Sequence, residues 1–144
     1  MDLGAYNLTA TTTGTGGLTF GGQISGSGSF TTGGSGTGTK TFSDSIYTFG
    51  AVTLGGSGAT TVSGSVGNAS SLAITNSAAT TISGSVNTAG AGGISHTGSG
   101  NATFSGSVGA TNGGGLTINS TGSTTFQQNR ERQQYRGHRR APAM

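Results

Sequence analysis

The sequence predicts an all-β protein, a parallel β-helix (solenoid) of about six coils with 20–22 residues per coil. A short phrase, Thr-apolar-Ser-Gly-Ser-apolar, recurs along the chain, and its apolar anchors are spaced 22, 20, 20, 22 and 22 residues apart. A period of this size is typical of proteins in which each repeat forms one turn of a stack. We expect the anchors to form one interior column: Phe20, Phe42, Val62, Ile82, Phe104 and Phe126.

Each repeat carries three apolar marks that predict three short strands. The first is an alternating pair such as Leu72 and Ile74, the second is the anchor, and the third lies four residues after the anchor. Side chains of a strand alternate between its two faces, so the residue before each inward anchor faces outward. That residue is threonine in every repeat, which predicts an outward row: Thr19, Thr41, Thr61, Thr81, Thr103 and Thr125.

The position two residues after the anchor predicts a corner of the coil. It holds glycine in four repeats and Asp44 in another. Glycine tolerates a positive φ freely and aspartate tolerates it better than most residues, so we expect a sharp bend with positive φ there. The glycines of this corner are Gly22, Gly64, Gly84 and Gly106.

An antiparallel β-sandwich or barrel is the alternative fold. Strand-sized segments joined by glycine-rich turns are typical of it too. It does not explain why the same residue types return every 20–22 residues, so we favour the parallel solenoid.

Composition divides the chain into two parts. Residues 1–126 are the repeat body and are nearly neutral, whereas residues 127–144 contain five arginines and one glutamate. We expect this basic tail to be disordered, because it has no periodic apolar residues to bury. One interpretation is an arm that binds nucleic acid or another anionic surface. The other, which we favour, is an out-of-frame end, because a one-base shift of permitted codons restores the residue types of the repeat.

We interpret the repeat body as a fragment of a longer array of repeats. The first residues lack the basic and apolar regions of a secretory signal, and there is no cysteine for a disulfide framework. A solenoid with open ends presents unpaired strand edges, so we expect end-to-end self-association. We expect no nucleic-acid partner and no membrane insertion.

Little in the sequence points to catalysis. Polysaccharide cleavage on a β-helix needs paired carboxylates, but the body holds only Asp2 and Asp44, about two coils apart. His96 takes a position that holds isoleucine in neighbouring repeats, and we interpret it as a structural imidazole and not as a metal ligand. One aspartate does not make a calcium-binding repeat. We therefore predict no enzyme, no cofactor and no metal site.

Four Asn-x-Ser/Thr sequons occur, but in a chain so rich in serine and threonine they carry no weight. They begin at Asn7, Asn68, Asn101 and Asn119.

The repeat pattern Leu-x-Ile-x-x-x-(x)-Gly-x-Thr-Thr-Phe-x-Gly-x-Val resembles the β-strand repeats of large bacterial exoproteins, the filamentous-haemagglutinin-like and autotransporter-passenger proteins. The best matches run from Leu72 to Val86, from Ile94 to Val108 and from Leu116 to Phe126. This resemblance implies a right-handed β-helix in an extracellular or outer-surface location, with a role in adhesion or as a spacer. Its partner would be a host or neighbouring-cell surface, reached through a parent protein.

The outward threonines suggest a second function. With the serines two residues further on, as in Thr81-x-Ser83, they would form two hydroxyl rows on a flat strand face. Such arrays resemble those of ice-binding proteins. Threonine is also simply a favourable exposed strand residue, so we keep ice binding as the alternative.

Overall fold

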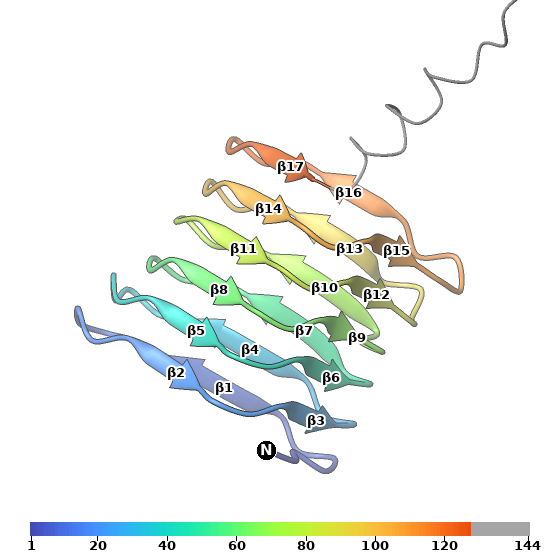
Figure 1. The fold of residues 1–144 in the computed structure, drawn as a ribbon, viewed down its shortest axis with the longest axis horizontal. Helices are drawn as coiled ribbons and strands as arrows, with labels where there is room; N and C mark the ends of the chain where they lie inside the picture. Colours follow the sequence, from blue (N-terminus) through green and yellow to red (C-terminus); the bar gives the residue numbers. More distant parts are fainter. Residues whose placement is uncertain (128–144) are drawn as a thin grey trace, which may run out of the picture.

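The computed structural model describes residues 1–127 as a solenoid of 17 short strands (Figure 1). Three strands form each turn, giving five full turns and two strands of a sixth, close to the expected six coils. Every strand pairing is parallel, which confirms the predicted parallel β-solenoid and rules out the antiparallel sandwich or barrel. The predicted basic tail lies, from residue 128 onward, outside the described residues.

The turns stack into three parallel sheets, one for each apolar mark of the repeat. The first sheet consists of β1 (Leu8–Thr11), β4 (Phe30–Gly33), β7 (Ala51–Leu54), β10 (Ser71–Ile74), β13 (Gly93–His96) and β16 (Leu116–Ile118). The second consists of β2 (Leu18–Phe20), β5 (Lys40–Phe42), β8 (Thr60–Val62), β11 (Thr80–Ile82), β14 (Ala102–Phe104) and β17 (Thr124–Phe126). The third consists of β3 (Ile24–Gly26), β6 (Ile46–Thr48), β9 (Val66–Gly67), β12 (Val86–Thr88) and β15 (Val108–Ala110).

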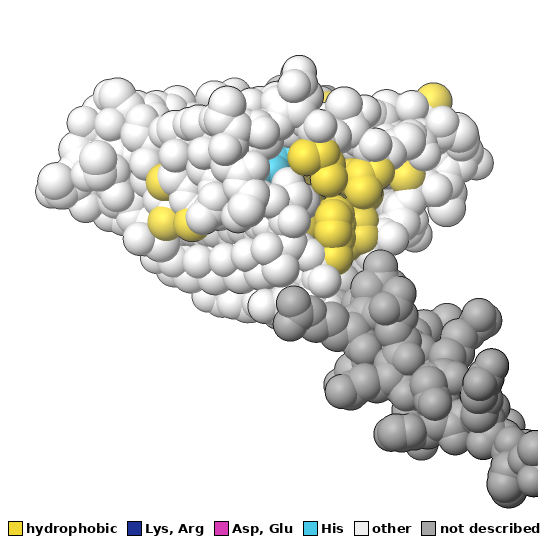
Figure 2. Space-filling model, turned by 90° about the horizontal axis from the view of Figure 1, so that it is seen from above, with side chains coloured by type: hydrophobic (Ala, Val, Ile, Leu, Met, Phe, Trp, Pro, Cys, Tyr) yellow, Lys and Arg dark blue, Asp and Glu magenta, His cyan; other side chains and the backbone are white. Residues whose placement is uncertain are grey.

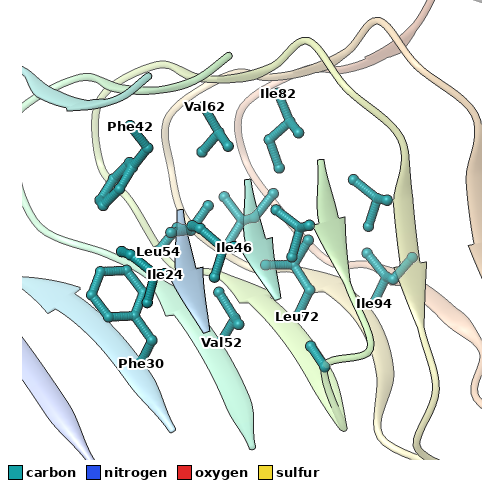
Figure 3. Close-up of a cluster of buried hydrophobic side chains, with 14 of the residues drawn as sticks. Ile24, Phe30, Phe42, Ile46, Val52, Leu54, Val62, Leu72, Ile82 and Ile94 are labelled. Atoms are coloured by element: carbon teal, nitrogen blue, oxygen red, sulfur yellow. The ribbon is translucent and has the colours of Figure 1, made fainter. Parts of the chain in front are cut away.

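The apolar marks of all three sheets meet inside the coil. Phe30, Val52 and Leu72 of the first sheet, for example, lie in register and are fully buried (Figure 3). One turn could not bury these side chains alone, but stacking places each between two neighbours. The core is therefore continuous along the whole stack.

The anchors of the second sheet form a column inside this core. Each anchor pairs in register with those of the turns before and after it. The rings of Phe20 and Phe42 stack with centroids 5.2 Å apart, as do those of Phe104 and Phe126, while Val62 and Ile82 fill the middle. Stacked aromatic rings therefore lie near both ends of the column.

The corner after the anchor is not the positive-φ bend that we expected. Positive φ occurs elsewhere, at Gly26, Gly34 and Gly56 for example, but not at Gly84 or its equivalents. At Gly64, Gly84 and Gly106 glycine is favoured for a different reason, which is the close approach of stacked backbones. A Cβ added at Gly84 would lie 2.5 Å from the carbonyl carbon and oxygen of Gly64 in the turn below.

The strand ladder continues one residue past the expected end of the repeat body. The backbone N–H of Gln127 donates to the Phe104 carbonyl (2.9 Å), and the Ser105 hydroxyl donates to the Gln127 side chain (2.7 Å). The described part of the chain contains no helix that is long and apolar enough to cross a membrane.

Candidate functional site

The outward threonines form one row on the second sheet. They pair with each other at every step from Thr19 to Thr125, and each lies between two inward-facing positions of its strand. The hydroxyl-bearing residues two positions further on continue the same ladder, because Ser63 and Ser83 donate their N–H groups to the anchors of the preceding turns. The second sheet therefore carries two adjacent hydroxyl rows over its central turns.

Inside the solenoid, the corner between the first and second sheets is polar. Its turns direct several backbone carbonyls inward, and a buried carbonyl without a donor is costly. Side chains from three turns act as donors to these carbonyls: Lys40, Asn76 and His96. We call this region the polar corner.

Lys40 is fully buried although lysine is almost never buried without a partner. Its Nζ donates to the Gly58 carbonyl at 2.7 Å. The two acidic residues among residues 1–127, Asp2 and Asp44, are both exposed. Desolvation by the surrounding protein lowers the pKa of the Lys40 ammonium below its ordinary value of 10.5.

Asn76 is the most highly connected donor of the polar corner. Its Nδ2 lies 3.0 Å from the carbonyl oxygens of both Gly58 and Ala78, with three further acceptors within 3.4 Å. Its Oδ1 is buried and has no hydrogen-bond partner among the described residues. Gly58 thus accepts from both Asn76 and Lys40, which ties the second, third and fourth turns together.

His96 fills the register position of Ile74 and Ile118 and is almost completely buried. Its Nε2 lies 2.9 Å from the Gly100 carbonyl, and its Nδ1 lies 2.8 Å from the Thr124 hydroxyl. A carbonyl only accepts, so we assign a hydrogen to Nε2, which donates to Gly100. Both ring nitrogens have partners within the solenoid, which gives the imidazole a structural role.

Asp44 and the four sequon asparagines do not form a common site. Asp44 is exposed, and its Oδ1 accepts the N–H of Ser45 at 2.7 Å. The four sequon asparagines are exposed, and two of them, Asn7 and Asn101, accept backbone N–H groups of the following turn. No three histidine, cysteine or acidic side chains within residues 1–127 are grouped in a way that could hold a metal ion.

Comparison with known proteins gives no relative. No protein-family description, curated protein or solved structure matches the chain.

The polar corner predicts a clear effect of removing its central donor. We expect Asn76→Leu to lower the free energy of unfolding by about 1–2 kcal/mol, because the buried Ala78 carbonyl loses its donor, whereas the Ala79 carbonyl keeps the N–H of Thr60 and Gly58 keeps Lys40. Urea unfolding followed by circular dichroism measures the change. Asn87→Leu is the control, since Asn87 points outward from β12, and it should shift stability by less than about 0.5 kcal/mol. Equal effects of the two substitutions would contradict this role of Asn76.

Proposed function

We propose that this chain is a non-catalytic structural segment of a bacterial cell-surface or secreted adhesin-like protein, in which it acts as a spacer. The observation that carries the proposal is the in-register repetition of all three sheets. Each added turn lengthens the stack by about 4.8 Å and presents the same outer surface again. Such a structure suits a spacer, which is a segment that holds other domains of a protein at a distance.

The polar side chains of the interior fit the same role. Lys40, Asn76 and His96 are buried, and their hydrogen bonds run within and between turns. The described outer surface consists largely of threonine, serine and glycine, a surface that repeats without strong charge. The repeat pattern's resemblance to large bacterial exoproteins supports a surface or secreted location. Adhesion to a host or neighbouring cell would then depend on the parent protein.

Localisation tests this proposal directly. In cells that make the protein, antibodies against the repeat body should detect it on intact cells or in the medium, and protease added outside should remove the cell-bound signal. A cytoplasmic enzyme of the same cells serves as the control for lysis. Antigen that is found only inside the cells, and that is protected from the protease, would refute a surface or secreted role.

Ice binding is the second candidate, favoured by the two hydroxyl rows of the second sheet. It predicts thermal hysteresis of the purified chain that is lost in Thr81→Leu. Thr53→Leu is the matched control, because Thr53 faces outward from β7 on the neighbouring sheet. The spacer proposal predicts no thermal hysteresis in the unmodified chain, so activity that disappears only with Thr81→Leu would decide for ice binding.

A further inference from the structure

We propose that copies of this chain stack head to tail, with residues 1–3 of one copy occupying the third-sheet layer of the sixth turn of another copy, a layer in which residues 1–127 have no strand. In this stack, the C-terminal end of the solenoid of one copy contacts the N-terminal end of the solenoid of the next copy. The inference concerns contacts between copies and goes beyond the spacer role.

The C-terminal end exposes the core of the solenoid. Leu116 and Ile118 of β16 occupy interior register positions, yet they are 49% and 48% exposed. Figure 2 views this end and shows hydrophobic side chains gathered beside the one histidine of the described residues. Within residues 1–127, the sixth turn has strands in the first and second sheets but none in the third, so that β15 ends its sheet.

The N-terminal end has an extra strand-like segment, residues 1–3, which pairs with the third sheet. Asp2 forms a parallel bridge with Ser25 of β3, and the flanking N–H of Leu3 donates to the Ser25 carbonyl at 2.7 Å. Leu3 is only 9% exposed and packs into the core. Residues 1–3 therefore lie one layer before β3, in a layer that has no strand of the first or second sheet.

The two ends are complementary parts of a single turn. If β1 of one copy pairs with β16 of another and β2 pairs with β17, residues 1–3 fall into the layer beside β15 that has no strand within residues 1–127. The repeat register then places Leu8 on Leu116, as Leu8 already pairs with Phe30. It places Phe20 on Phe126, and both of these rings already stack on a neighbour in their own copy at 5.2 Å. All three sheets continue across the junction without a gap.

A buried hydroxyl at the N-terminal end fits the same junction. Thr12 is buried, and its Oγ1 has no hydrogen-bond partner among the described residues. The ladder register places Thr12 one layer beyond Ser120 in the proposed stack. Ser120 itself donates to the carbonyl of Gly98, the residue one layer before it at the same register position. Thr12 of the incoming copy is positioned to do the same with Ser120.

Cysteine cross-linking tests the junction, because the chain has no native cysteine. In the proposed stack, Thr125 of one copy and Thr19 of the next are exposed neighbours in adjacent layers, about 4.8 Å apart, a separation that suits a disulfide. We expect full-length T19C and T125C to form a mixed disulfide dimer when combined under mild oxidation. T9C replaces T19C in the control, since Thr9 faces outward from the first sheet, and its mixture with T125C should give at least tenfold less product.

Two results would overturn the inference. Predominant T125C homodimers would mean that the C-terminal ends meet each other about a two-fold axis, and a yield no higher than that of the T9C control would mean that no such junction forms. A second measurement makes the test independent of cysteines. Ile118→Lys should abolish the concentration-dependent rise in mass seen by analytical ultracentrifugation, whereas Phe49→Lys, which changes a 67% exposed ring away from the ends, should preserve it. An unmodified chain that stays monomeric at high concentration would also refute the proposal.

Discussion

Gly84→Ala should destabilise the solenoid by about 3 kcal/mol or more, at the upper end of the range for overpacked positions. The new methyl group would lie 2.5 Å from the carbonyl group of Gly64 and 2.6 Å from the Ser65 nitrogen. Both are backbone atoms in hydrogen-bonded layers, so they cannot turn aside as a flexible side chain does. Relief requires that neighbouring turns separate, which weakens the ladders on all three sides.

Gly22→Ala is the matched control, because Gly22 holds the same position of the repeat in the first turn. No atom lies within 4 Å of the Cβ that would be added there, and φ is not positive. Alanine restricts the unfolded chain, so this substitution should leave stability unchanged or raise it by up to about 1 kcal/mol. Urea unfolding of both variants measures the difference. A similar loss of stability in both would show that glycine is required there for its backbone freedom and not for close packing.

These glycines show how far the sequence could predict the structure. The period of 20–22 residues and the two-residue alternation are direct consequences of stacking in layers, and both are visible without coordinates. The same glycine at the same position is visible too. The reason why glycine stands there cannot be read from the sequence. The distance between stacked backbones follows from the shape of the corner, and a positive φ would explain a glycine equally well.

The polar corner could have been found from the alternation and was not. Lys40 lies two residues before the anchor Phe42, and Asn76 lies two residues after Ile74, so a period of two places both side chains inward. The polar character of lysine and asparagine argued against placing these side chains in the interior. The inward carbonyls that make it favourable come from turns whose backbone conformation the sequence does not specify.

Function was harder to predict than fold for a physical reason. The sequence gives the order of the outward side chains. It does not show which surfaces the two ends of the solenoid expose or which molecules bind there. The proposed junction, which places Leu8 of one copy on Leu116 of another, depends on the number of strands in each sheet, and that number emerges only when the turns are counted in three dimensions.

The substitution Lys40→Met should stabilise the protein by about 2–4 kcal/mol at pH 7. The buried ammonium has lost its water and gained one hydrogen bond, to Gly58 at 2.7 Å. Methionine has nearly the same length and no charge, and it adapts to irregular space. The Gly58 carbonyl keeps a donor in Asn76, so the substitution leaves no new unpaired acceptor there. The native protein can avoid the buried charge only by releasing a proton, at about 1.4 kcal/mol for each pH unit below the ordinary pKa of 10.5, which limits the gain.

The pH dependence identifies the cause of this stabilisation. Burial lowers the pKa of Lys40 in the folded state, so between that lowered pKa and 10.5 the unfolded chain binds more protons than the folded one. The stability of the unmodified protein therefore rises with pH through this window, whereas Lys40→Met lacks this contribution. The advantage of the variant should be largest at neutral pH, shrink as the pH approaches 10.5 and stay constant above it. Urea unfolding of both proteins at a series of pH values measures the difference. An advantage that does not change with pH would show that methionine acts through better packing, and a destabilised variant would show that the bond from Lys40 to Gly58 outweighs the cost of burying the ammonium.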